Sequence, residues 1–203
     1  FMAWRRSHIT DSGFILTLAL ITGLLSGISA WMLKYMISNI SAFAHRMADI
    51  TGLDYMIILA PVTGITLAAL FCRYVIRQNV DNGVARMIDS LKCKNYKLDS
   101  KTIYGSMIAS AFTLGFGGTA GSEGPIAYAG AGIGSRLGQL LKVNPRMLMI
   151  LIGCGSAAGI AGIFKAPIGG ALFAIEVLRV ELSTVAIMGV FLATLSSSLV
   201  AYS

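Results

Sequence analysis

Long stretches of this chain carry no charged residue, and their lengths constrain the fold more than any other feature. Charge-free runs of about 20 residues occur at 13–33, 55–72, 102–122, 147–164 and 182–203. An α-helix needs roughly 20 apolar residues to cross the hydrocarbon core of a bilayer. Only 12% of the residues are charged and 56% are hydrophobic. The sequence therefore predicts an all-α, multi-pass integral membrane protein with one transmembrane domain over residues 1–203.

Two further charge-free runs, 124–135 and 166–175, are too short to cross a membrane. We expect half-helices or buried re-entrant segments there, because broken helices in a bilayer must line a cavity or be covered by protein. Residues 13–40 and 53–77 are predicted to form two long helices joined by a short turn. Of the 23 glycines, 16 lie within 105–170, which favours close packing of helices in that region.

The basic residues predict how the chain is oriented. The segment 73–101 contains seven lysines and arginines against three aspartates. By the positive-inside rule this segment and the amino terminus with Arg5 and Arg6 are cytoplasmic, and His45 and Arg46 lie outside. The first apolar run is not followed by a small-residue cleavage site, so we interpret it as a retained span. We expect a cell (inner) membrane, whose lipid surface explains the net charge of +7 better than nucleic acid does.

The sequence does not favour an enzyme or a metal site. Its three cysteines have no paired spacing, which argues against a disulfide or metal ligands: Cys72, Cys93 and Cys154. Residues 153–156, Gly-Cys-Gly-Ser, faintly resemble the G-x-S of an intramembrane serine protease. Such a serine needs a histidine base, and the only histidines, His8 and His45, lie in the amino-terminal tail and the predicted outside turn. We therefore predict no enzymatic activity and no cofactor.

Glu123 is the residue that most clearly predicts a functional site. It follows 21 uncharged residues and precedes 12 more, and an ionisable group at membrane depth is costly to keep unless it has a role. Gly124 and Pro125 come next, and proline is favoured in the first turn of a helix, so a helix should begin near Glu123. The free N–H groups and positive dipole end of a helix start form an anion site. The alternative is a glutamate that only caps its own helix.

The Glu123 carboxylate is itself an anion, so it can occupy that site in place of a permeant ion. Protonation or displacement would then move it away, which predicts a gate. A second helix start is indicated at Asn82, Gly83 and Val84, where asparagine is a good N-cap and glycine allows close approach of a ligand. A turn before a basic loop explains these three residues equally well. A third start is marked by Pro167, in a short helix closed by Glu176, which alone fits an ordinary interfacial charge.

Two motifs resemble a known family. Residues 121–125, Gly-Ser-Glu-Gly-Pro, resemble the G-(K/R)-E-G-P motif of the CLC chloride channels and chloride/proton exchangers. Residues 164–176, Phe-Lys-Ala-Pro-Ile-Gly-Gly-Ala-Leu-Phe-Ala-Ile-Glu, resemble that family's A-P-x-x-G-x-L-F-x-x-E segment. The resemblance covers roughly residues 10–203. It implies a homodimer with one pore per subunit, built from two inverted repeats of short, broken and tilted helices whose N-termini converge on the anion.

The resemblance implies that this chain supplies the first repeat, and that a second repeat, absent from the 203 residues, completes the pore. It also implies that chloride or a similar small anion is the substrate, that lipid surrounds the protein and that Glu123 is the gate. The anion-binding positions it implies lie at two helix starts: Asn82, Gly83, Val84, Ser122, Gly124 and Pro125.

The sequence departs from the family's pattern at three places. Ser122 stands where the family usually has lysine or arginine, which removes a positive charge from the pore mouth. Residues 82–85, Asn-Gly-Val-Ala, fall where the family has S-G-I-P. Asparagine there also resembles the fluoride-exporting branch, although Pro125 does not fit that branch. Val177, beside Glu176, occupies the place of the inner proton-transfer glutamate of many exchangers.

Since valine cannot carry a proton, Val177 favours a channel-like mechanism. The alternatives are a proton-coupled chloride exchanger and a fluoride-type exchanger. Outside the family, the broken helices also suit an unrelated cation-coupled secondary transporter in which Glu123 is a proton or cation site.

Overall fold

Helices account for nearly all of the described chain. The computed structural model describes residues 11–51, 55–76, 84, 85, 88, 98, 100–176 and 183–202, and no strand occurs among them. The elements are α2 (Asp11–Thr51), α3 (Tyr55–Phe71), the π-helical turn η1 (Cys72–Ile76), α5 (Ser100–Gly115), α6 (Glu123–Leu140), α7 (Pro145–Phe164), α8 (Pro167–Glu176) and α9 (Thr184–Tyr202). The predicted all-α class is confirmed.

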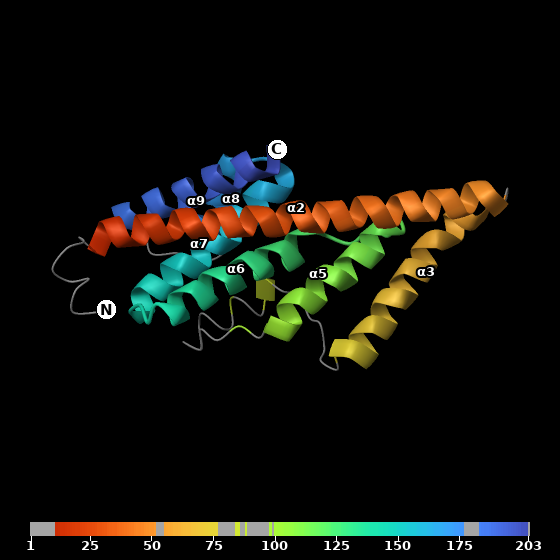
Figure 1. Ribbon diagram of the computed structural model, residues 1–203, viewed down its shortest axis with the longest axis horizontal. Helices are drawn as coiled ribbons and strands as arrows, with labels where there is room; N and C mark the ends of the chain where they lie inside the picture. The colour runs from red at the N-terminus through yellow and green to blue at the C-terminus, as the bar shows by residue number, and fades with distance from the viewer. Residues whose placement is uncertain are drawn as a thin grey trace.

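Helix α2 is longer than its sequence pattern predicts. It has 41 residues, about 60 Å of helix, and runs the length of the molecule in Figure 1. The prediction that it ends at residue 40, with His45 and Arg46 in an outside turn, is wrong, because both residues lie within α2. Neither glycine nor proline occurs between Gly27 and Gly52, so nothing interrupts the helix before its end.

Three described helices are long and apolar enough to cross a membrane: Ser12–Met47, Pro145–Phe164 and Thr184–Tyr202. The other two predicted spans form the shorter helices α3, of 17 residues, and α5, of 16 residues. Helix α8 has 10 residues, as expected for a half-helix. The run 124–135, also predicted to be short, forms the 18-residue helix α6, because Arg136 continues the helix instead of ending it.

Helices α2 and α7 run side by side in the same direction. A Cβ atom added at Gly155 would lie 3.2 Å from Cγ2 of Thr22, and one added at Gly162 would lie 2.9 Å from Cβ of Ala30. Residue numbers therefore rise together along both helices. Fifteen residues of α7 are buried, as expected for a helix that is apolar on every side.

Helix α9 runs parallel to both of these helices. Gly189, near its start, approaches Ala19 of α2 and Cys154 of α7. Further along, the Ser198 hydroxyl donates a hydrogen bond of 3.3 Å to the carbonyl oxygen of Ala161. The N-termini of α2, α7 and α9 thus lie at one end of the bundle.

Helix α6 packs against α7 in the opposite direction. Its three glycines at every fourth position face the α7 backbone or side chains: Gly130, Gly134 and Gly138. In the same order these glycines approach Gly155, Leu151 and Leu148. Residue numbers therefore rise along α6 in the direction in which they fall along α7. Small residues at this spacing allow close contact between helices. Helix α6 therefore ends where α7 begins and starts deep along the bundle.

Candidate functional site

The start of α6 is the centre of the candidate site. Glu123 is the first residue of the helix, as predicted, and Ser122 occupies the N-cap position without making a side-chain capping hydrogen bond. The amide of Ile126 donates to the Ser122 carbonyl oxygen at 3.2 Å. Pro125 has no N–H group, so the amides of Glu123 and Gly124 are the N–H groups that this first turn presents to a ligand.

A cavity of about 830 Å³ adjoins this helix start. It lies against α3, α5 and α6, and it brings together four of the residues predicted for the site: Val84, Glu123, Gly124 and Pro125. Val84 is helical and half-buried. Ser122 is half-buried but does not line this cavity. Asn82, Gly83 and Val177 lie outside the described residues.

Glu123 also lines a second cavity, of about 300 Å³, on the side of α7 and α8. Ala166, directly before the start of α8, lines the same cavity. Phe173 is the other residue shared by both cavities. Glu123 therefore lies between two cavities, and the smaller of them also adjoins the start of α8.

The Glu123 side chain is exposed, and it lines cavities on both sides of the start of α6. A carboxylate in this position can meet water or an ion, as a gate requires. A glutamate that merely caps α6 would also be the first residue of the helix. The position of Glu123 alone therefore does not distinguish a gate from a cap.

A positive charge lies in the turn beside the second cavity. Lys165 has a left-handed backbone, with φ of 55°, and ends α7. Its Nζ atom is 4.6 Å from the centroid of the Tyr202 ring, a cation–π contact that fixes the turn against α9. Its neighbours Phe164 and Ala166 both line the cavity. A cation here favours anions in the nearby space.

The sequence reasoning missed the hydroxyl-bearing face of α5. Ser106, Ser110 and Thr113 all line the larger cavity. Their spacing of four and three residues places them on one face of a helix, and this spacing was the available signal. The uncharged, mostly apolar composition of residues 102–122 masks this spacing in the sequence.

Other features of the described chain lie apart from this site. Cys72 and Cys154 are free thiols, and Cys93 is outside the described residues. The hydroxyl of Ser156 has no hydrogen-bond partner, and Nδ1 of His45 lies 2.8 Å from the Ser41 carbonyl oxygen. The serine–histidine pair that a protease needs is therefore not formed by these two residues.

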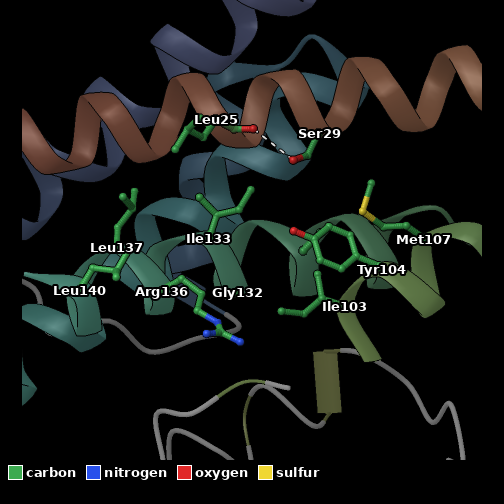
Figure 2. A pocket seen from close by; sticks show the side chains of 11 residues that line it. Leu25, Ser29, Ile103, Tyr104, Met107, Gly132, Ile133, Arg136, Leu137 and Leu140 are labelled. Atoms are coloured by element: carbon green, nitrogen blue, oxygen red, sulfur yellow. Dashed lines mark hydrogen bonds between the residues drawn. The ribbon is translucent and has the colours of Figure 1, made fainter. Parts of the chain in front are cut away.

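A further cleft, of about 210 Å³, lies between α2, α5 and α6 and contains none of the residues predicted for the site. Figure 2 shows apolar side chains such as Ile133 and Met107 along it, with Arg136 on the α6 side. Two hydroxyls line it, on Ser29 and Tyr104, and that of Ser29 donates to the carbonyl oxygen of Leu25 at 3.1 Å (Figure 2). This cleft thus presents little polar surface to an ion.

The chain is similar to known chloride channel proteins. The chain is 30% identical over 191 residues to chloride channel protein clh-3 of Caenorhabditis elegans, covering 86% of this chain and 19% of that protein. It is 29% identical over 188 residues to chloride channel protein CLC-b of Arabidopsis thaliana, covering 79% of this chain and 23% of that protein. The chain therefore spans about a fifth of the length of these relatives.

Solved structures show the same fold. A slow cyanobacterial Cl⁻/H⁺ antiporter superposes with a TM-score of 0.78 at 22% identity, over 95% of this chain and 47% of that one. A CLC-type fluoride/proton antiporter gives a TM-score of 0.74 at 29% identity, over 96% and 48%. The family model described as voltage gated chloride channel matches residues 64–203. Since this match includes the start of α6 and both cavities around Glu123, the chain belongs to the voltage gated chloride channel family, known as CLC.

Proposed function

We propose that this protein moves chloride or a similar small anion across the cell membrane through a CLC-type pore, with Glu123 as the gate. The observation that carries the proposal is the place of Glu123, at the uncapped start of α6 and on the boundary of two cavities. Free amides and a helix dipole attract an anion without the strong binding that a full positive charge would give. The carboxylate competes for the same place.

The proposed anion-binding positions are the two helix starts predicted from the sequence. At the start of α6, the proposed positions are Ser122, Gly124 and Pro125. Since Pro125 has no N–H group, the donors there are the amides of Glu123 and Gly124. Residues 82–84, Asn-Gly-Val, are proposed to supply the second start. The presence of Val84 in the cavity of Glu123 supports this assignment. We also propose that the remaining part of the pore comes from a second repeat, because the chain covers 47% and 48% of the solved structures that it matches.

The helix directions support the proposed orientation. Helix α6 ends at the end of the bundle where α2, α7 and α9 begin. Lys142 lies in the connection between α6 and α7, and Arg146 lies in the first turn of α7. In the sequence, Arg5 and Arg6 come shortly before the start of α2. Positive charge gathered at one end of a bundle favours a cytoplasmic location for that end. The amino terminus is therefore proposed to be cytoplasmic.

The homodimer that the family resemblance implies stays a prediction. Large apolar side chains are exposed on α8 and α9, among them Ile168, Leu172 and Leu199. In a membrane protein, such side chains suit lipid and a second subunit equally well.

Within the family, we propose a channel-like mechanism. The sequence has Val177 directly after Glu176, and a valine cannot relay a proton. The rival is a proton-coupled exchanger, favoured by the likeness to a CLC-type fluoride/proton antiporter at 29% identity. A water-filled path would allow coupling without a second glutamate.

The reversal potential under a pH gradient distinguishes these two mechanisms. We expect the reconstituted protein, held in a fixed chloride gradient, to keep the same reversal potential when one side is acidified. A channel responds only to the anion gradient, whereas a coupled exchanger also responds to the proton gradient. The control is a symmetric pH change on both sides. A reversal potential that follows the proton gradient would replace the channel by an exchanger.

A further inference from the structure

We propose that the Ser110 hydroxyl is a direct ligand of the anion in the larger cavity, donating a hydrogen bond to it opposite the start of α6. This inference rests on the proposed function and deepens it, because it names a side chain that binds the substrate. Ser110 lies on α5, away from both helix starts that the sequence motifs mark.

The Ser110 hydroxyl is a buried donor without a partner. The residue is 7% exposed, and its Oγ atom makes no hydrogen bond within the described protein. Leaving a buried hydroxyl unpaired is unfavourable. An unpaired, buried hydroxyl at the wall of a cavity indicates that a ligand or a water molecule accepts its hydrogen bond.

Most neighbouring hydroxyls satisfy themselves within their own helix. Thr113, one turn further along α5, donates to the carbonyl oxygen of Ala109 at 3.0 Å. Ser29 does the same to Leu25 at 3.1 Å, as drawn in Figure 2. Thr66 donates to Val62 at 2.7 Å. This is the usual behaviour of serine and threonine in helices, and Ser110 departs from it.

Among the described residues, two other buried hydroxyls share this lack of a partner, on Ser26 and Ser156. Neither residue lines any of the four cavities described for the molecule. Ser110 alone combines an unpartnered hydroxyl with a place on the wall of the cavity that Glu123 also lines. The combination, rather than burial by itself, assigns it to the anion.

The chemistry fits a small monovalent anion such as chloride or fluoride. The start of α6 supplies the amides of Glu123 and Gly124 on one wall, and Ser110 supplies an O–H donor on another. Neutral donors from two helices replace part of the hydration shell of an ion without trapping it. Since the serine side chain is short, the strength of this contact should depend on ion size.

The test compares Ser110→Ala with the matched variant Ser156→Ala in the purified protein. Chloride binding by calorimetry is expected to be about tenfold weaker in Ser110→Ala, the size expected for one lost hydrogen bond to a charged ligand. Ser156→Ala should bind as the unaltered protein does. Ser110→Thr, which keeps the hydroxyl, should restore most of the affinity. Both alanine variants should fold, because removing an unpaired hydroxyl costs little.

The outcomes separate this inference from the proposed function. If the unaltered protein binds chloride and Ser110→Ala binds it equally well, the ligand assignment is overturned and the proposed function stands. Equal weakening in Ser110→Ala and Ser156→Ala would also overturn the assignment, since the effect would then be structural. If the unaltered protein binds neither chloride nor fluoride, both the proposed function and the ligand assignment fail.

Discussion

Replacing Glu123 by glutamine is expected to abolish the response of anion flux to external pH. In the unaltered protein, acidification protonates the carboxylate, which then no longer competes with the anion for the amides at the start of α6. Flux should therefore rise as the external pH falls. Glutamine keeps the shape of the side chain and cannot lose a proton, so flux should be the same at every pH. Alanine, which removes the carboxylate, should also leave the pore open.

Glu176→Gln is the matched control for this experiment. Glu176 is also an exposed glutamate on a short helix that begins near the site, but it ends α8 and lines neither cavity of Glu123. Its variant should keep the full pH response of flux through reconstituted vesicles. An unchanged pH response in Glu123→Gln would remove Glu123 from its role as the gate and leave it as a helix cap.

Adding a single methyl group at Gly130 is expected to destabilise the fold. A Cβ atom there would overlap the carbonyl oxygen of Gly155, and a Cβ atom at Gly155 would overlap the carbonyl oxygen of Gly130. Backbone atoms cannot rotate away as a side chain does, so α6 and α7 must separate. Overpacking of this kind costs about 1–3 kcal/mol or more. If the free energy of unfolding falls by about 3 kcal/mol, the Tm of Gly130→Ala in a chain of this length should fall by roughly 6–12 °C.

The control for this prediction is Gly189→Ala on α9. A Cβ atom at Gly189 meets Cβ of Ala19 and Sγ of Cys154 at 3.5 Å, an ordinary contact distance. Alanine also has the higher helix propensity, so the Tm of this variant should stay the same or rise slightly. Thermal unfolding of the two purified variants in the same detergent measures both Tm values. If both variants unfold at the same temperature, the close approach of α6 and α7 is not the source of stability described here.

The local signals in the sequence predicted where helices begin. Pro125 and Pro167 each mark a start, and α6 and α8 begin at Glu123 and Pro167. Proline reports a backbone constraint that acts within one turn, so tertiary contacts do not override it.

The ends of other helices are less predictable from the sequence, because a charged residue does not by itself end a helix. Lys34, Arg46 and Arg136 all lie inside helices. A charged residue is a good helix former and can extend its long side chain towards water. Hydropathy therefore located the apolar surface correctly without locating the ends of α2 or α6.

The least predictable part of the site was its second wall. The sequence motifs place Glu123 and its neighbours, but they contain no information on which face of α5 lies opposite. That face depends on how α3, α5 and α6 pack, which places Ser106, Ser110 and Thr113 on the same cavity as Glu123. Contacts between segments far apart in the chain decided this arrangement.

Ion selectivity tests the central proposal most directly. Vesicles containing the reconstituted protein are loaded with radioactive chloride or radioactive sodium, and efflux is followed with protein-free vesicles as the control. We predict rapid efflux of chloride with sodium retained, because the free amides and the positive dipole end at the start of α6 favour an anion beside Glu123. Efflux of sodium with chloride retained would contradict anion transport and would make Glu123 a cation site.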